Sequence, residues 1–264
     1  MCFHQLIKFM KSFKIVISPS KSLSNIKNEN CRTFSQPRFI EKSVSLVNLL
    51  KKISPEDLGL LMGISPKLAE LNWVRYQNWT VPFSEENSRQ AILTFSGDVY
   101  EGLNANDFSE TDFDYSQHHL RILSGLYGLL SPLDLIQPYR LEMGSSLLSV
   151  KNQTLYDYWS KLIAESLNSE LKQGDILVNL ASNEYFKAID QKRLKAKILN
   201  IEFRESKPDG LKVVAILSKR ARGLMARYSI KNKISNVENL KLFDSEGYMF
   251  NEPLSSDSKW VFIR

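Results

Sequence analysis

Hydroxyl and amine side chains follow the first expected strand of the chain. The apolar run Lys14–Ser18 predicts a short strand, and Ser18, Ser20 and Lys21 stand at its end. Strand ends in open α/β sheets are frequent ligand sites, so this set could hold a phosphate or activate a nucleophile. The segment lacks the glycines of a phosphate-binding P-loop, which excludes that motif. The alternative is a capped turn with an exposed lysine.

Acidic and aromatic side chains follow a second expected strand, Ala91–Phe95. Asp98 and Tyr100 come shortly after it, and Asp98 could act as a general base or as a metal ligand. Further acids could join Asp98 around a divalent ion, although their spacing does not match an EF-hand loop: Glu101, Asp112 and Asp114. The alternative role for Asp98 is the N-cap of a helix.

A third expected strand, Ile176–Leu180, ends just before Asn183 and Glu184. Glu184 and Lys187 are three residues apart, so they could pair across one helical turn. Alternatively, they line the same cleft as the lysine that follows the first strand. The candidate catalytic residues are Lys21, Asp98, Asn183 and Glu184.

The most basic element of the chain is the stretch 218–227. On a helix, Lys219, Arg222 and Gly223 share one face, because residues three or four apart align. Gly223 would let another backbone come close, and arginine suits bidentate phosphate contacts. Residues 187–233 hold 14 basic and 4 acidic residues, whereas residues 85–115 hold 8 acidic and 1 basic. Such segregation is typical of a protein with an anionic partner, nucleic acid above all; a solvated basic helix is the alternative.

Two glycines, Gly125 and Gly128, bracket Leu126 and Tyr127 between two apolar runs. Glycine takes positive φ at no steric cost, so this turn could bring backbone N–H groups close to a phosphate. The dipeptide at 131–132, Ser-Pro, predicts the start of a short helix after the turn. The alternative is a plain turn between packed elements.

Composition narrows the class of protein. The 264 residues are 43% hydrophobic, which suits a buried core, and no apolar run approaches the roughly 18 residues of a membrane span. Two cysteines, Cys2 and Cys31, form no disulfide framework and fit a reducing compartment. The three histidines and two cysteines make no recognisable zinc pattern, and no cofactor is indicated. The adjacent His118 and His119 point differently on a helix and suit one iron ion poorly.

Helical and extended segments alternate along the chain. Apolar spacing and cap signals predict three linked helices within 37–78 and further helices at 106–120, 154–172 and 219–232, the last capped by Ser218. Strands are expected at 14–18, 91–95, 176–180, 196–203, 211–217 and 260–263. This mixture predicts the α/β class, as one compact mixed domain over residues 13–264. Residues 1–12 are expected to be an extension, with Met10 as an alternative start.

The motifs, taken in order, resemble one family. They are ISPSK at 17–21, GDVYEGL at 97–103, LRILSGLYGLLSPLDLIQPYRLEMG at 120–144, LYDYW at 155–159, NLASNEYF at 179–186 and KRARGLMARY at 219–228. This series is similar to the bacterial YaaA-type peroxide-stress proteins, from about Lys14 to the C-terminus. The resemblance implies a cytoplasmic protein that acts in the response to hydrogen peroxide and limits damage linked to free iron. It also implies a positively charged cleft and a helix–hairpin–helix element that binds duplex DNA, here mapped to Leu123–Gly128. It implies no catalytic role and no cofactor.

Two main hypotheses for the function follow. The first is a DNA-binding protein without a membrane partner, whose phosphate contacts are Arg121, Ser124, Gly125, Leu126, Tyr127, Gly128, Lys187, Lys219, Arg220, Arg222 and Arg227. The second is an enzyme that acts on a nucleotide or nucleic acid with the polar residues at the strand ends. Convergence of those side chains in one pocket would favour the enzyme, whereas scattered acids that cap helices would count against it. A third hypothesis, iron sequestration, rests only on the acids between residues 98 and 114.

Overall fold

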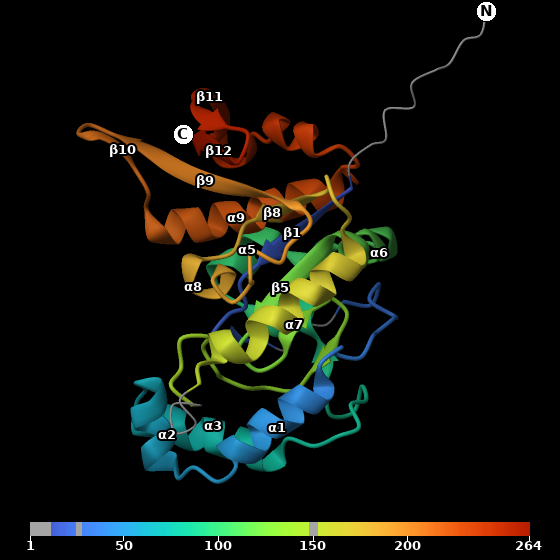
Figure 1. The fold of residues 1–264 in the computed structure, drawn as a ribbon, viewed down its shortest axis with the longest axis vertical. Coiled ribbons are helices and arrows are strands. Elements are labelled where there is room, and N and C mark those ends of the chain that lie inside the picture. The colour runs from blue at the N-terminus through green and yellow to red at the C-terminus, as the bar shows by residue number, and fades with distance from the viewer. Residues whose placement is uncertain (1–11, 25–27, 148–152) are drawn as a thin grey trace, which may run out of the picture.

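Strands rich in Ile, Val, Leu and Phe form the central sheet of the computed structural model, which describes residues 12–24, 28–147 and 153–264 (Figure 1). The strand order is β11-β12-β9-β8-β1-β5-β6, with β10 paired to β9 outside this path. The parallel strands are β1 (Phe13–Ile17), β5 (Leu120–Ser124), β8 (Ile176–Asn179), β9 (Lys197–Lys207) and β12 (Lys259–Ile263). The antiparallel strands are β6 (Gly128–Leu130), β10 (Gly210–Lys212) and β11 (Met249–Ser256). β1, β5 and β8 are buried along almost their whole length, as strands covered on both faces are.

Helices cover both faces of this sheet. They are α5 (Asp98–Leu103), α6 (Glu110–His119), α7 (Leu155–Glu170), α8 (Asn183–Phe186) and α9 (Ala215–Lys231). Figure 1 shows α7 on one face, with α5, α6 and α9 together on the other. The side chains of β1 alternate between these layers: Lys14 reaches Glu170 of α7 at 3.4 Å. The ring of Phe13 packs on His119 of α6 instead, with ring centroids 5.6 Å apart. The result is a single mixed α/β domain, as predicted.

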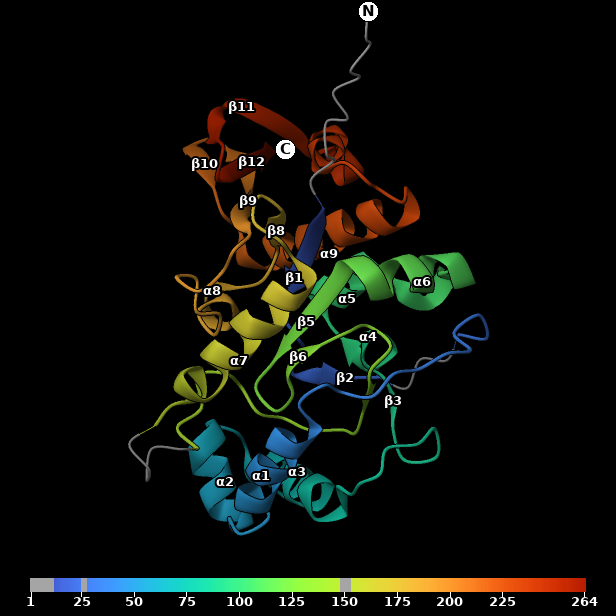
Figure 2. The same cartoon turned by 45° about the vertical axis from the view of Figure 1, so that its right-hand side comes forward.

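Three linked helices lie at the end of the molecule opposite β11 and β12 (Figures 1 and 2). They are α1 (Ile40–Leu50), α2 (Pro55–Met62) and α3 (Pro66–Asn78), as the sequence predicts. α2 begins at Ser54, whose Oγ accepts a hydrogen bond from the N–H of Asp57 at 3.1 Å. It ends at Gly63, which has φ 59° and ψ 46°, a left-handed conformation that glycine adopts without strain. The chain therefore reverses tightly into α3.

Short elements connect these layers. They are β2 (Ser22–Leu23), β3 (Arg89–Gln90), α4 (Ala91–Thr94), β4 (Phe95–Ser96), η1 (Ala105–Asp107), β7 (Leu135–Ile136), η3 (Val237–Leu242) and η4 (Ser245–Gly247). The prediction of a strand at 91–95 is wrong, because most of this segment forms the helical turn α4. In that turn the hydroxyl of Thr94 donates to the carbonyl of Gln90 at 2.8 Å. A short buried apolar run fits a helix as well as a strand, so periodicity could not separate the two.

Two other local predictions are wrong. Ser131 and Asp134 form a turn instead of a helix start: the N–H of Ser131 donates to Oδ2 of Asp134 at 2.8 Å, and the chain continues into β7. The predicted N-cap Ser218 lies inside α9, which already begins at Ala215. The strand expected at 211–217 is correspondingly short. Residues 1–11, including Met10, lie outside the described residues. In the described part of the chain, no helix has the length and apolar character needed to cross a membrane.

Candidate functional site

The glycine turn predicted to contact phosphates joins two strands in the buried core. It connects β5 to the antiparallel β6, so the helix–hairpin–helix prediction for Leu123–Gly128 is wrong. The side chains of Leu126 and Tyr127 are 0% exposed. Oγ of Ser124 accepts hydrogen bonds from the N–H groups of Leu126 at 3.2 Å and Tyr127 at 2.9 Å. These amides are therefore already satisfied and are out of reach of a phosphate.

The two glycines of this turn accommodate the protein's own chain. A Cβ at Gly125 would overlap the carbonyl oxygen of Leu141, and would lie 3.0 Å from its carbon. Gly128 has φ 70°, and a Cβ there would stand 2.6 Å from the ring of Trp159. That ring donates a hydrogen bond from Nε1 to the carbonyl of Gly125 at 2.9 Å. The close backbone approach predicted from the glycines is internal packing.

Arg121, another predicted DNA contact, is buried with 6% of its surface exposed. Its guanidinium pairs with Glu170 at 2.6 Å and donates to the carbonyls of Gln117 and Leu120. Glu170 also pairs with Lys14 and with the guanidinium of Arg38 at 2.7 Å. A buried arginine whose charge is compensated in this way holds α7 against the sheet. It cannot serve as a phosphate contact.

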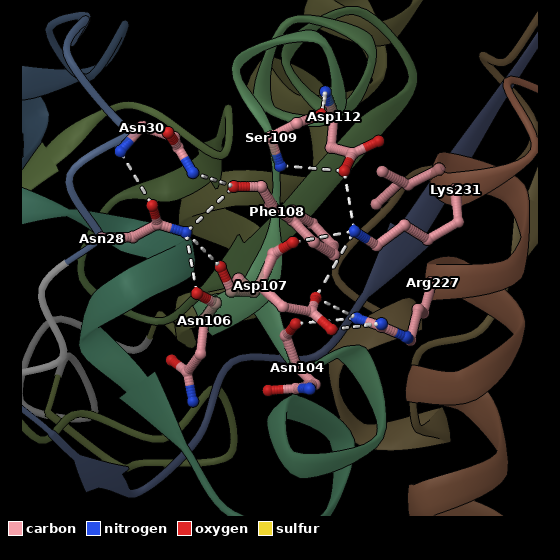
Figure 3. Close-up of polar contacts among 12 residues, drawn as sticks. Asn28, Asn30, Asn104, Asn106, Asp107, Phe108, Ser109, Asp112, Arg227 and Lys231 are labelled. Carbon is pink, nitrogen blue, oxygen red and sulfur yellow. Dashed lines mark hydrogen bonds and ion pairs between the residues drawn. The ribbon is translucent and has the colours of Figure 1, made fainter.

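Arg227 is committed to a loop of its own chain (Figure 3). It forms a two-pronged ion pair with Asp107, at 2.7 and 2.6 Å, and also donates to the carbonyl of Asn104 at 2.8 Å. Lys231 extends this network by donating to Asp112 at 2.8 Å. Although burial raises the pKa of Asp112, hydrogen bonds from Lys231 and a second lysine hold it well below its ordinary value. These contacts attach α9 to the loop before α6 and commit both terminal nitrogens of Arg227 to that loop.

The remaining predicted cations differ in their surroundings. Arg220 pairs with Glu246 at 2.7 Å. Lys187 is exposed at the end of α8, and no ion pair between it and Glu184 occurs within the described ranges. Lys219 and Arg222 line a cavity instead.

This cavity has a volume of about 500 Å³ and lies beyond the carboxyl ends of β1 and β8. Four segments form it: the loop after β1, the loop and α8 after β8, the start of α5 and one face of α9. Its chemically capable side chains are Ser18, Lys21, Asp98, Glu184, Lys219 and Arg222. Three of the four candidate catalytic residues therefore lie around one space. Asn183 is exposed beside it and does not line it.

Hydrogen bonds fix the two strand-end loops to each other. Oγ of Ser18 accepts from the N–H of Ser182 at 2.8 Å and lies 3.3 Å from its hydroxyl oxygen. The hydroxyl of Tyr100 donates to the carbonyl of Ser18 at 3.0 Å. Burial raises the pKa of Tyr100 well above its ordinary value, so the phenol stays protonated. Ser18 and Tyr100 thus build the wall of the cavity.

The helices α5 and α9 cross in close contact beside the cavity. A Cβ at Gly223 would overlap the carbonyl oxygen of Val99, and one at Gly102 would lie 2.9 Å from the amide nitrogen of Leu224. This contact brings the first residue of α5, Asp98, towards Lys219 of α9. Their charged groups lie 3.9 Å apart. The N-cap of α5 is Gly97, so the alternative role of Asp98 as an N-cap is wrong.

The cations of the cavity are unequally compensated. Lys21 pairs with Glu142 at 2.8 Å, and this carboxylate also holds Arg140 at 3.0 Å. The carboxylate of Glu184 accepts from the N–H of Gly144 at 3.3 Å. Arg222 is half-buried and makes no hydrogen bond or ion pair within the residues that the structure describes. Burial lowers the pKa of its guanidinium below the ordinary value. No local pattern indicates a role for Glu142, since only the fold brings it to Lys21.

A glycine hairpin between two helices does occur, at α2 and α3. After the left-handed Gly63, the N–H of Ile64 donates to the carbonyl of Gly59 at 3.1 Å. Ser65 then precedes α3 without forming a side-chain cap, and Lys67 is exposed in the first turn. Among the described residues, no acceptor binds the N–H groups of Ser65 and Lys67. The sequence predicted the helices but not this hairpin; the signal that could have found it is Gly63 followed by the Ser-Pro dipeptide at 65–66.

In the described part of the chain, no group of three or more His, Cys, Asp or Glu side chains is arranged to hold a metal ion. Of the acids between residues 98 and 114, Asp98, Asp107 and Asp112 instead pair with lysines or arginines.

The mixed sheet, with polar strand ends around a cation-lined cavity, defines an α/β protein with a cavity at the carboxyl edge of its sheet. The family model described as "Peroxide stress protein YaaA" matches residues 13–254, and the chain belongs to this family. A relative from Acaryochloris marina, named UPF0246 protein, is 50% identical over 95% of this chain and 99% of its own length. UPF0246 proteins from Colwellia psychrerythraea and Aliivibrio fischeri are 47% and 50% identical, each over 95% of this chain. They are covered over 98% and 97% of their own lengths.

Proposed function

We propose that this protein acts in the response to hydrogen peroxide by binding duplex DNA and limiting iron-linked damage to it. Membership of the peroxide stress family supports a role in the response to hydrogen peroxide. The observation that carries DNA binding is the hairpin between α2 and α3, with open amides at the start of a 13-residue helix. Helix N-termini bind phosphates through such amides and through the positive end of the helix dipole.

The hairpin fits sequence-independent contact with a nucleic acid backbone. Gly63, Ser65 and Lys67 are all exposed, so a phosphate can approach the amides and the lysine ammonium together. Backbone amides and lysines position a protein on DNA without reading its bases. The affinity is therefore expected to be similar for unrelated duplexes and to fall with salt.

Direct reaction of a described cysteine with peroxide is a weaker explanation. The thiolate is the form that reacts with peroxide, and it needs a lowered pKa. Burial raises the pKa of Cys31 to about 11, with Glu85 adding to the effect, so this half-buried thiol stays protonated. Cys2 lies outside the described residues.

The test compares a charge reversal in the hairpin with a matched reversal elsewhere. Lys67→Glu places an acid in the first turn of α3, where a negative charge favours the helix dipole, so folding is not compromised. The control, Lys172→Glu, makes the same change of net charge at an exposed position after α7. Fluorescence anisotropy with two unrelated labelled duplexes should show that Lys67→Glu weakens binding about tenfold and lowers its salt dependence. Equal losses in both variants, or no binding even near 50 mM salt, would reject the proposal.

A further inference from the structure

Arg222 is the arginine that lines the cavity beyond β1 and β8, and its guanidinium has no carboxylate partner among the described residues. Arg121, Arg220 and Arg227 each pair with a carboxylate at 2.6 or 2.7 Å. Arg222 is half-buried and has no such partner among the described residues. Burial lowers the pKa of its guanidinium, because no neighbouring carboxylate offsets the loss of water. Removing a charge from water without pairing it costs free energy. An arrangement of this kind is favourable once an anion occupies the space in front of it.

Two more cations face the same space. Lys219 lies one helical turn before Arg222 on α9, so both side chains project into the cavity. Lys21 enters from the loop after β1. Both lysines are more than half exposed and hold their carboxylates at the rim, at 3.9 Å for Lys219 and 2.8 Å for Lys21. Such exposed ion pairs are worth little, so an entering anion can replace them.

The cavity also carries acceptors that a bare anion would not use. The carboxylates of Asp98 and Glu184 face it from opposite elements, α5 and α8. One oxygen of Glu184 accepts from the N–H of Gly144, which fixes the carboxylate and leaves its second oxygen for a ligand. Ionised carboxylates accept hydrogen bonds only, so their partners are hydroxyl or amino groups. The expected ligand therefore combines an anionic group with hydrogen-bond donors.

The size of the cavity selects a small molecule. Its volume of about 500 Å³ falls within the range of sites that enclose nucleotide-sized ligands, about 300–1,000 Å³. The position of the cavity also favours a ligand site. β1 lies between β5 and β8 in the sheet, so the strand order reverses beside β1, at the edge where the cavity lies. Ligands of open α/β sheets bind at such a reversal of strand order.

We propose that this cavity binds a small phosphate monoester that carries hydroxyl groups. The phosphate contacts Arg222, Lys219 and Lys21, and the hydroxyl groups donate to Asp98 and Glu184. Sugar phosphates and nucleoside monophosphates share this chemistry. The site is separate from the α2–α3 hairpin, so it does not depend on DNA binding.

Isothermal titration calorimetry tests the site with four probes: adenosine 5′-monophosphate, ribose 5-phosphate, adenosine and inorganic phosphate. One or both phosphate esters should bind, and adenosine and inorganic phosphate should bind at least about tenfold more weakly. If adenosine 5′-monophosphate binds more tightly than ribose 5-phosphate, the ligand is a nucleoside phosphate. If the two esters bind equally, the site recognises the sugar phosphate part alone. Adenosine binding as well as the nucleotide would overturn the phosphate assignment. Inorganic phosphate binding as well as the esters would overturn the role of the hydroxyl groups.

Substitution of the unpaired arginine gives a second readout. Arg222→Gln should weaken ester binding about tenfold or more, and should raise the midpoint of thermal unfolding without ligand, because it removes an uncompensated charge. The control Arg220→Gln lies two residues away on α9, outside this cavity, and should leave ester binding unchanged. Unchanged affinity in Arg222→Gln would overturn the proposal. Lys67→Glu should bind the esters normally, which distinguishes failure of this site from failure of the DNA-binding proposal.

Discussion

Gly223 of α9 packs directly on the backbone of Val99 in α5. A Cβ at position 223 would overlap the Val99 carbonyl oxygen and would lie 2.8 Å from the amide nitrogen of Leu103. The two helices cross at this point without any side chain between them. The contact holds Asp98, at the start of α5, beside Lys219 of α9, and both residues line the cavity together with Arg222. Close packing of the two helices and the geometry of the cavity therefore depend on the same glycine.

Gly223→Ala should consequently destabilise the protein. The added methyl group meets backbone atoms, which cannot rotate away, so α5 and α9 must separate. We expect a loss of about 2–3 kcal/mol in the free energy of unfolding, measured by urea denaturation. The control is Gly59→Ala in α2, where a Cβ would make an ordinary contact at 3.4 Å with Ala69. That change should be neutral or stabilising by up to about 1 kcal/mol, because alanine favours helices. A Gly223→Ala protein as stable as the wild type would contradict the role of this contact.

The helix face that carries Lys219, Arg222 and Gly223 could be predicted from spacing alone, since helical periodicity is a local property. The sequence also placed polar residues at the ends of β1 and β8, which prove to be neighbouring strands, and this is why Lys21 and Glu184 share a cavity. Asp98 joins them from the start of α5, because the strand expected before it is mostly the helical turn α4. Parallel strands of one sheet end at the same edge, so short-range patterns were sufficient there.

The glycine turn shows where local pattern fails. Glycine at positions 125 and 128 signals that something comes close to the backbone, but the pattern cannot say what. In the structure the neighbours are Leu141 and Trp159, which come from other parts of the chain. Likewise, the ion pairs of Arg121 and Arg227 join residues 49 and 120 positions apart in the sequence. Such long-range contacts are set by the fold, so a charged residue looks like a surface residue until its partner is known.

Gly125→Ala tests the internal role of this turn. Its added Cβ would overlap the Leu141 carbonyl oxygen inside the core, and we expect a loss of about 3 kcal/mol in the free energy of unfolding. Because the turn is buried, the affinity of the folded variant for duplex DNA should equal that of the wild type. Urea denaturation measures the free energy of unfolding, and fluorescence anisotropy on the same preparation measures the affinity for DNA. A folded, stable variant that has lost DNA binding would restore the turn as a phosphate contact.

The buried Asp134 should make stability depend on pH. Burial raises its pKa to about 6, although hydrogen bonds from Ser35 and Ser131 oppose the shift. An acid with a raised pKa in the folded state binds its proton more tightly there than in the unfolded chain. Its contribution to stability is therefore largest below about pH 4 and is lost as the pH rises through about 6. The size of this loss is about 3 kcal/mol.

Asp134→Asn removes this titration and nearly preserves the shape of the side chain. The free energy of unfolding of the wild type, minus that of the variant, should fall by about 2 kcal/mol between pH 4 and pH 7, because part of the full loss occurs below pH 4. Denaturation series at several pH values measure this difference. A difference that stays constant, or that rises with pH, would show that Asp134 is ionised throughout.

Glu142 competes with any anionic ligand for the cavity lysine. Its carboxylate holds Lys21 at 2.8 Å and Arg140 at 3.0 Å. Glu142→Gln frees the Lys21 ammonium, so a phosphate ester should bind about threefold to tenfold more tightly. Calorimetry with ribose 5-phosphate measures the change. The control Glu202→Gln breaks an ion pair with Arg204 on β9, remote from the cavity, and should not alter affinity. Weaker binding in Glu142→Gln would mean that the carboxylate positions Lys21 for the ligand instead of competing with it.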